Sequence, residues 1–364
     1  MTDHDYMKLA LSLAEATRGQ TSPNPSVAAI VVKDGAVVGT GVHMKTGGPH
    51  AEVFALDQAG ELARGATLYV TLEPCSHHGK TPPCAEKVVA SGVSTVVVAT
   101  RDPNPLVAGQ GIALLTHHGI KVIEGIEEQR ARMLNAPFFH SVTTNRPYVT
   151  LKAGMTLDGK IATSTGESKW ITSDAAREDA HTLRHQHDAI LVGKHTILHD
   201  NPSLTTRRPR GGRNPIRIVL DSELTLPHTY KIFQDGQAPT WVYTTKYANE
   251  EKRKELERIG VQVLQLQEET LSIDAVLEDL GKRNIQSVLV EGGGTVLASF
   301  VESKAFQQVV LYMAPKLFGG TQTQVMGGAG IASIIDAHQL KFIHVELLGP
   351  DIKVVAIPNE EEVT

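Results

Sequence analysis

The two cysteines of this 364-residue chain, Cys75 and Cys84, lie in one short stretch, and His50 precedes them. One imidazole and two thiolates at such spacing are typical zinc ligands, so the fold must bring three separated positions to one point. These ligands fill three of the four tetrahedral positions and leave the last for a water molecule, whose pKa then falls toward neutrality. The sequence therefore predicts a catalytic zinc site that supplies hydroxide at neutral pH.

Glu52 stands two residues after His50, as in the signature H-x-E followed by P-C-x-x-C that zinc deaminases carry. In that signature the glutamate shuttles protons beside the metal. The second half is stretched here, because eight residues separate Cys75 from Cys84. We predict hydroxide attack on an amino-bearing ring carbon, with Glu52 as the catalytic group.

Two other interpretations of the cysteines remain open. They could form a disulfide or be ordinary buried thiols, although the chain has the composition of an intracellular protein. A structural zinc site would need a fourth protein ligand, which His77 or His78 could provide, but Glu52 would then have no task.

Local sequence patterns place these residues at the starts of helices. Residues two apart point to nearly opposite sides of a helix, so His50 and Glu52 can converge on one metal only at the first turn. We therefore expect a helix that begins near His50 and stops at Gly60. Likewise, we expect Cys84 in the first turn of a helix that ends at Gly92, where unpaired amides favour a thiolate.

Strand and helix patterns alternate along the chain, which predicts an α/β fold. Asp34-Gly35 marks a hairpin turn between two β-rich runs, and 126–139 has a helical pattern. The polar segment SVTTNRP ends at Pro147, so we expect domains at 1–145 and 146–364. In the second domain, we expect strands at 148–153, 189–192, 216–220, 240–243, 261–266 and 287–290, with antiparallel strands at 308–313 and 353–357 completing a mixed sheet.

The charge balance limits the class of partner. Lysine and arginine total 35 against 40 acidic residues, which disfavours a broad nucleic-acid-binding surface. A cluster of arginines in a Pro/Gly-rich loop suits either phosphate binding or a solvated loop: Arg207, Arg208, Arg210 and Arg213. The amino terminus has no signal-peptide pattern, and no apolar run is long enough to cross a bilayer. We expect a cytoplasmic protein with no membrane partner.

Two glycine patterns in the second domain bear on nucleotide binding. Gly154 and Gly159-Lys160 have P-loop spacing, but Ile161 replaces the hydroxyl residue that holds magnesium, so a turn at Asp158-Gly159 is the better explanation. The run 292–294 follows an apolar strand and precedes a helix, so it is either a phosphate-binding turn or simply a tight turn. The strict G-x-G-x-x-G spacing is absent from the sequence, which argues against an ordinary Rossmann domain.

Taken together, the motifs resemble those of the bifunctional riboflavin-biosynthesis family, over nearly the whole chain. In that family a cytidine-deaminase-like pyrimidine deaminase is fused to a reductase with a dihydrofolate-reductase-like α/β fold. The stretched spacing between Cys75 and Cys84 is this family's form of the deaminase motif. The segments that carry the resemblance, in family order, are TSPNP, HAE, TLEPCSHHGKTPPCAE, RDPNPLVAGQG, LKAGMTLDGKIAT, SKWIT, VGKHTILHDNPSLTTR, VEGG and APKLFGG.

For the first domain, the resemblance implies zinc-dependent deamination of 2,5-diamino-6-(5-phosphoribosylamino)pyrimidin-4-one. His50, Cys75 and Cys84 would hold Zn²⁺, and Glu52 would act first as base and then as acid. The implied substrate contacts are Asn24, His77, Lys80, Asp102 and Asn104, any of which could instead cap a loop.

For the second domain, the resemblance implies reduction of the ribosyl group to ribityl by NADPH. The implied cofactor contacts are Gly154, Trp170, Thr196, Asp200, Ser222, Gly293, Gly294, Thr295, Val296, Leu297, Ala298 and Ser299. The implied substrate contacts are Lys152, Ser168, Arg184, Leu204, Arg207 and Glu291. Of these, Arg184 and Arg207 suit a phosphate because guanidinium pairs bidentately with oxyanions, whereas Lys152 could equally be an ion-pair partner.

The expected partner is thus a small phosphoribosyl pyrimidine, and we expect a homo-oligomer. A rival interpretation is a nucleoside or tRNA-base zinc deaminase with an unrelated fused reductase domain. That rival would call for a basic tract along the nucleic-acid path, which the acidic balance does not favour.

Overall fold

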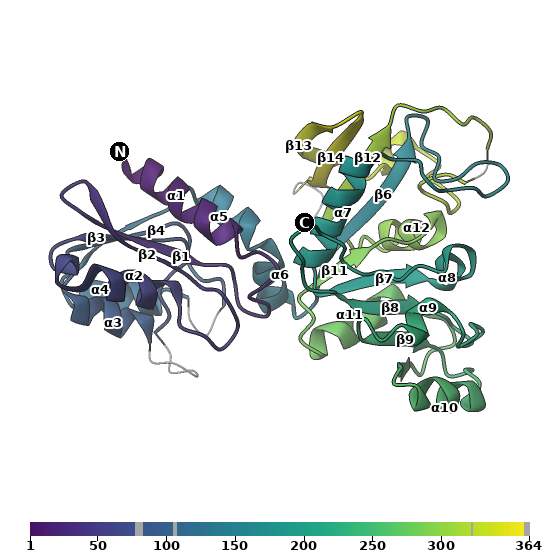
Figure 1. The fold of residues 1–364 in the computed structure, drawn as a ribbon, viewed down its shortest axis with the longest axis horizontal. Helices are drawn as coiled ribbons and strands as arrows, with labels where there is room; N and C mark the ends of the chain where they lie inside the picture. Colours follow the sequence, from purple (N-terminus) through teal and green to yellow (C-terminus); the bar gives the residue numbers. More distant parts are fainter. Residues whose placement is uncertain (77–82, 105–107, 322, 360–364) are drawn as a thin grey trace. The chain divides into compact units, whose positions relative to one another are not determined.

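The structure is a computed structural model that describes residues 1–76, 83–104, 108–321 and 323–359. It divides into two compact units, Met1–Asn145 and Arg146–Thr364 (Figure 1). Among the described residues, no helix combines the length and apolar character needed to cross a bilayer.

The first unit is a five-stranded sheet with helices on both faces (Figure 1). The strand order is β2-β1-β3-β4-β5, with β1 antiparallel to β2 and β3 and with β3, β4 and β5 parallel. The elements are α1 (Asp3–Glu15), β1 (Ala28–Lys33), β2 (Ala36–Val42), α2 (Ala51–Ala59), η1 (Gly60–Ala63), β3 (Thr67–Val70), α3 (Cys84–Ser91), β4 (Thr95–Val98), α4 (Gln110–His117), β5 (Lys121–Glu124), α5 (Glu128–Leu134) and α6 (Ala136–Thr144).

The period of two along β1 explains this layering. Ala29 and Val31 pack with α2, α3 and α4, whereas Ala28, Ile30 and Val32 pack with α1 and α5. Because both faces of the strand are covered, its sequence is a continuous apolar run. The expected hairpin turn after β1 is confirmed, since Asp34 and Gly35 both have positive φ, 50° and 79°.

Helix α2 lies unusually close to β2. A Cβ atom added at Gly41 would lie 2.0 Å from the carbonyl oxygen of Ala51, and one at Gly39 would lie 2.1 Å from that of Ala55. Only glycine therefore fits at these two positions of the strand.

The second unit is a nine-stranded mixed sheet with the order β10-β9-β8-β7-β11-β6-β12-β14-β13. The strands from β10 to β12 are parallel, and β14 is antiparallel to both β12 and β13. The elements are β6 (Tyr148–Thr156), α7 (Asp174–Gln186), β7 (Ala189–Gly193), α8 (Lys194–Asp200), β8 (Ile216–Leu220), α9 (Lys231–Gln234), β9 (Thr240–Thr244), α10 (Glu250–Arg258), β10 (Gln262–Gln265), α11 (Ile273–Lys282), β11 (Ser287–Val290), α12 (Gly294–Glu302), β12 (Gln308–Ala314), η2 (Ile334–Asp336), β13 (Leu340–Leu348) and β14 (Asp351–Pro358).

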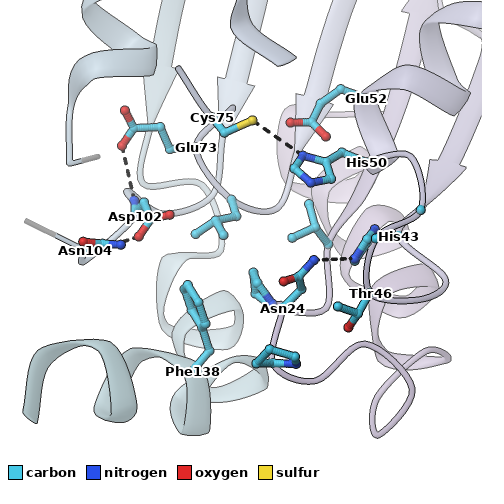
Figure 2. A pocket seen from close by; sticks show the side chains of 16 residues that line it. Asn24, His43, Thr46, His50, Glu52, Glu73, Cys75, Asp102, Asn104 and Phe138 are labelled. Atoms are coloured by element: carbon cyan, nitrogen blue, oxygen red, sulfur yellow. Dashed lines mark hydrogen bonds between the residues drawn. The ribbon is translucent and has the colours of Figure 1, made fainter. Parts of the chain in front are cut away.

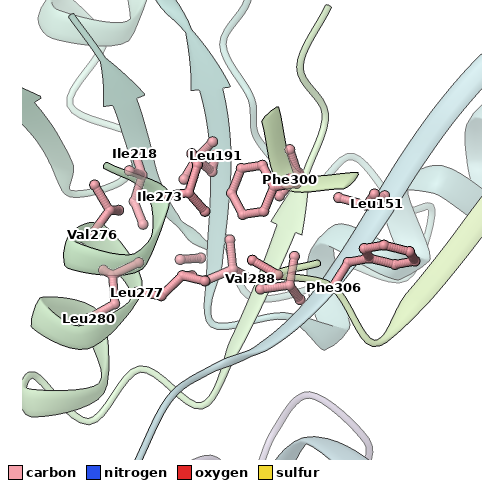
Figure 3. Close-up of a cluster of buried hydrophobic side chains, with 14 of the residues drawn as sticks. Leu151, Leu191, Ile218, Ile273, Val276, Leu277, Leu280, Val288, Phe300 and Phe306 are labelled. Carbon is pink, nitrogen blue, oxygen red and sulfur yellow. The ribbon is translucent and has the colours of Figure 1, made fainter. Parts of the chain in front are cut away.

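The main core of this unit lies where α11 and α12 cover the parallel strands (Figure 3). Leu277 of α11 and Phe300 of α12 pack against Leu191 and Val288 of the central strands. Helices α8, α9 and α10 cover the other face of β7, β8 and β9, and α7 covers β12 and β14. The sheet is thus buried on both faces along its parallel part, as βαβ connections require.

The structure differs from the expected secondary structure in two places. The helical pattern at 126–139 is divided between α5 and α6, which meet at Asn135. The buried Asn135 amide accepts a hydrogen bond from the backbone N–H of Ser26 (2.8 Å) and donates one to its carbonyl (3.0 Å), so tertiary pairing interrupts the helix. Strand β13 was not predicted, because its exposed apolar residues do not follow one period of two.

Candidate active site

The three predicted zinc ligands meet in the first unit. The Nδ1 atom of His50 lies 3.2 Å from the Sγ atom of Cys84 and 3.5 Å from that of Cys75. One ligand atom from each residue lies within 4.8 Å of the other two, which is the separation of ligands around a single metal ion. Neither cysteine forms a disulfide, so that alternative is excluded.

Two helix starts bring the ligands together. His50 is the residue that precedes α2, and Cys84 is the first residue of α3, as the spacing predicted. The chain of Cys75 runs beside the start of α3, where its sulfur accepts from the Cys84 N–H (3.4 Å) and its carbonyl accepts from the Ala85 N–H (3.1 Å). Helix α3 ends at Gly92, which has φ 73° as a left-handed cap.

The electrostatics of the triad suit a bound cation. Hydrogen bonds from Cys84 and His50 lower the pKa of Cys75 to about 4. The contact with Cys75 and burial raise the pKa of the Cys84 thiol, and the contact with Cys75 raises that of His50. Cys75 is therefore held as a thiolate, which is the form that binds a divalent cation.

Glu52 lies in the first turn of α2, beside the triad (Figure 2). Its side chain is buried, and burial raises its pKa to about 7. Its Oε2 atom has no hydrogen-bond partner among the described residues. A buried carboxyl oxygen without a partner is costly, so its position next to the triad indicates a group that binds a ligand or moves a proton.

A cavity of about 460 Å³ opens beside the triad (Figure 2). Asn24, Asp102 and Asn104, three of the predicted substrate contacts, line it together with His50 and Glu52. The other two predicted contacts, His77 and Lys80, lie outside the described residues. A polar cavity of this size beside a metal site can hold a heterocycle with its substituents.

Sequence reasoning missed two buried residues of this cavity, His43 and Glu73. The His43 ring packs edge-on against His50 at 5.3 Å, and its Nδ1 and Nε2 atoms pair with the Pro49 carbonyl (3.0 Å) and the Asn24 amide (3.1 Å). Nothing in the sequence marks His43, whereas Glu73 lies two residues before Cys75 and could have been considered.

In the second unit, three predicted residues meet at a partly buried charge cluster. The Glu291 carboxylate accepts two hydrogen bonds from Arg184, at 2.8 and 2.9 Å, and the Lys152 ammonium lies 3.5 Å away. Burial opposes the charged carboxylate, but Arg184 and Lys152 outweigh it and hold the pKa of Glu291 well below its usual range. Lys152 also lies over the Tyr312 ring, 5.6 Å from its centroid.

Arg184 and Arg207 therefore differ in availability. The Arg184 guanidinium is engaged by Glu291 and by the Thr205 carbonyl (3.1 Å), whereas Arg207 is exposed. His181 was not predicted; burial and the charges of Arg184 and Arg207 lower its pKa to about 4. Of the two arginines, Arg207 is thus the better placed to receive an external anion.

Most of the residues predicted to bind NADPH lie at or beyond the carboxyl ends of the parallel strands, where α/β sheets bind ligands. Gly154 is near the end of β6, Thr196 and Asp200 are in α8 after β7, and Ser222 follows β8. Ser168 donates to Asp200 (3.4 Å), Trp170 is exposed, and Leu204 is buried with φ 52°.

The glycine-rich turn after β11 is shorter than its sequence suggests. Gly293 precedes α12, and Gly294 to Ser299 are already helical, with Leu297 and Ala298 buried. A Cβ atom at Gly292 or Gly193 would lie 2.6 or 2.7 Å from the Val296 side chain, while one at Gly293 would meet open space. A phosphate could therefore approach the first amides of α12 at Gly293.

Two family models match the chain. The model described as the cytidine and deoxycytidylate deaminase zinc-binding region matches residues 1–100, and that of the RibD C-terminal domain matches residues 147–354. These matches confirm the predicted order of a cytidine-deaminase-like domain and a reductase domain within an α/β fold.

Similar proteins match nearly the whole chain. Riboflavin biosynthesis protein RibD of Bacillus amyloliquefaciens is 49% identical, over 98% of this chain and 96% of that protein. RibD of Escherichia coli is 41% identical, over 97% of this chain and 98% of that protein. The solved structure of Acinetobacter baumannii RibD has a TM-score of 0.89 at 39% identity, and covers 98% of this chain and 99% of its own.

We predict that Cys75→Ser lowers zinc affinity by more than about 100-fold, because losing a direct ligand costs more than losing an outer partner of a ligand. Zinc per chain can be measured after dialysis against a weak chelator. His118→Ala, at an exposed histidine outside the triad, is the control and should keep the wild-type zinc content. Full zinc occupancy in Cys75→Ser would contradict the ligand assignment.

We also predict that Arg184→Met destabilises the second unit by about 3 kcal/mol, because it leaves the buried Glu291 charge partly uncompensated. Urea unfolding followed by the fluorescence of Trp241, in β9, would measure the change. Arg207→Met makes the same replacement at an exposed arginine and should change the free energy of unfolding little. Equal destabilisation by both variants would argue against the Arg184–Glu291 pair as the cause.

Proposed function

Because the chain belongs to the RibD family of riboflavin-biosynthesis proteins and is a bifunctional deaminase and reductase, we propose which substrates it converts and which residues act in each reaction. A Thermotoga maritima structure with 39% identity and a TM-score of 0.87 is described as a diaminohydroxyphosphoribosylaminopyrimidine deaminase and 5-amino-6-(5-phosphoribosylamino)uracil reductase. We assign the same two substrates to this chain. The product would be 5-amino-6-(5-phosphoribitylamino)uracil.

The observation that carries the deaminase assignment is the buried Glu52 beside His50, Cys75 and Cys84. His50, Cys75 and Cys84 would hold a zinc ion, and the ion would make a bound water acidic enough to act as a nucleophile at neutral pH. A structural zinc site would instead need a fourth protein ligand, and the buried Glu52 carboxyl would then have no role.

Glu52 would carry the protons of the deamination. As the new C–O bond forms at the amino-bearing ring carbon, Glu52 takes a proton from the attacking water and passes it to the adjacent ring nitrogen. Glu52 then takes the remaining proton from the new hydroxyl group and delivers it to the amino group. As the C–N bond breaks, the C–O bond becomes a carbonyl and ammonia leaves. The raised pKa of Glu52 suits a group that must both accept and donate a proton near neutral pH.

Asn24, Asp102 and Asn104 line the same cavity and would orient the pyrimidine. Amide and carboxylate groups match the alternating donors and acceptors of such a ring. His77 and Lys80 remain part of this proposal on the basis of the family resemblance alone.

For the reduction, NADPH would supply a hydride to the sugar carbon that bears nitrogen. The open turn at Gly293 and the start of α12 would hold a phosphate of the cofactor, with Gly154, Trp170, Thr196, Asp200 and Ser222 along the same edge of the sheet. Arg207 would bind the substrate phosphate, and the Lys152 ammonium, fixed by Glu291, would face the sugar.

The rival of a nucleoside or tRNA-base deaminase with an unrelated reductase is less favoured. The curated relatives match both domains in one chain, over nearly its full length. We expect a small-molecule substrate, no nucleic-acid or membrane partner, and a cytoplasmic location, which suits two cysteines outside any disulfide.

We predict that Glu52→Gln retains zinc but loses ammonia release by at least about 10³-fold, because an amide does not titrate near neutral pH and cannot take the proton from water. The NADPH oxidation that follows addition of the deaminated substrate should continue at the wild-type rate. Glu61→Gln, at an exposed glutamate of the same unit, is the matched control. Equal loss of both activities in Glu52→Gln would refute the assignment of two separate sites.

We further propose that two copies of the chain pair through β13, the last strand of the nine-stranded order. A register shift between Phe342 and His344 inserts one residue, so four exposed apolar side chains share one face of the strand. Their exposed fractions are 40, 70, 58 and 74% for Leu340, Phe342, Val345 and Leu347. Such an apolar strand at an open edge favours pairing with another strand.

The sequence of β13 is complementary to itself. In a two-fold antiparallel pair that places Phe342 opposite Val345 of a second copy, Leu340 lies opposite Leu347. Lys341 then lies opposite Glu346, on the other face. Opposite charges and apolar pairs therefore match in one register, which favours a second copy of this chain as the occupant.

Phe342→Lys should raise the dissociation constant of this dimer by about 100-fold, because each copy loses the burial of an aromatic ring. Sedimentation over a range of protein concentrations would measure it. Val37→Lys, at an exposed apolar residue of β2, is the control and should leave assembly unchanged. A wild-type monomer at every concentration, or unchanged assembly of Phe342→Lys, would contradict the proposal.

A further inference from the structure

Glu73 is a buried carboxylate that accepts four backbone hydrogen bonds from one segment of the chain. Its Oε2 atom accepts from the N–H groups of Asp102 (3.2 Å) and Gly109 (3.0 Å). Its Oε1 atom accepts from those of Gly111 (3.0 Å) and Ile112 (3.2 Å). A single side chain thus holds both ends of the segment that leads from β4 into α4.

This segment carries two residues of the cavity wall, Asp102 and Asn104. The Asp102 carboxylate accepts from the Asn104 N–H (2.9 Å), and the Asn104 carbonyl accepts from the Ala108 N–H (2.9 Å). Figure 2 shows Glu73 above Asp102 in the view, with a hydrogen bond from the Asp102 backbone N–H to its carboxylate. The positions of both polar side chains therefore depend on where Glu73 holds their backbone.

The other neighbour of Glu73 is the metal triad. Cys75 follows it by two residues, and the Glu73 N–H donates to the Thr100 carbonyl (3.0 Å). The contact between the two segments is close: a Cβ atom at Gly111 would lie 2.0 Å from the Pro74 carbonyl oxygen. Glu73 thus ties the segment that supplies a metal ligand to the segment that lines the cavity.

Only an ionised carboxylate suits this arrangement. It offers acceptor sites on both oxygens, whereas the amide of glutamine would turn two donors toward N–H groups that are themselves donors. Two of the four amides belong to the first turn of α4, where the helix dipole also favours a negative charge. Replacing the carboxylate by an amide leaves buried amides unpaired and loosens the segment.

We propose that Glu73 is a positioning residue of the deaminase site, which fixes Asp102 and Asn104 relative to the zinc ligands and thereby sets substrate affinity. This inference rests on the proposed deaminase function. It assigns Glu73 no contact with the reacting atoms, so substitutions there should act mainly on KM. Glu52, by contrast, should act mainly on kcat.

The test is Glu73→Gln in the full-length enzyme loaded with zinc. We expect the KM for ammonia release to rise by about tenfold, the equivalent of one lost charge-assisted hydrogen bond, with kcat changed less than threefold. Zinc content and NADPH oxidation with the deaminated substrate should match the wild type. Glu73→Asp, which keeps the charge on a shorter side chain, should recover part of the affinity.

A merely structural role gives a different result. It would lower the thermal midpoint of the first unit while leaving KM unchanged, and this outcome would overturn the inference. If Glu73→Gln does not fold, Glu73→Asp decides by the same split between KM and kcat. Glu61→Gln is the control for loss of a glutamate. A wild-type enzyme that releases no ammonia would instead refute the proposed function, independently of Glu73.

Discussion

The meeting of two helix starts at one point is the constraint on which the first site depends. α2 and α3 belong to separate strand-to-helix connections, yet His50 and Cys84 come within 3.2 Å because both helices begin at the same edge of the sheet. Free amides at these starts favour thiolate and carboxylate groups. The sheet therefore supplies the geometry of the triad, and the helix termini supply part of its electrostatics.

Two buried glutamates, Glu52 and Glu73, and the nearly buried Glu291 differ in how their charge is satisfied. Glu73 is surrounded by four amides, and Glu291 by a guanidinium and an ammonium. Glu52 keeps an oxygen that has no partner among the described residues, and burial raises its pKa. Satisfied carboxylates hold a structure in place, whereas the unsatisfied one is free to exchange protons. The contrast separates two carboxylates that support the structure from the one that we propose as the proton carrier.

Local chemistry explains which features could be predicted from the sequence. The metal triad follows from residue types and spacing, and the hairpin turn at Asp34-Gly35 follows from backbone preferences. By contrast, the break at Asn135 and the pairing of Arg184 with Glu291 depend on partners far away in the chain. Spacing along the sequence does not reveal such partners. The apolar face of β13 could not be predicted from the sequence either. The residue inserted at its bulge interrupts the alternation of apolar and polar residues.

The two glycines of β2 have a consequence for redesign of the enzyme. Because the strand touches the backbone of α2 at Gly39 and Gly41, any larger residue would act as a wedge under the helix that carries Glu52. Libraries that seek new pyrimidine specificities should therefore keep both glycines and vary Thr46 or Phe138 at the cavity wall. At these two positions, the short distance between the backbones of β2 and α2 limits which residues are tolerated, rather than any role in the reaction.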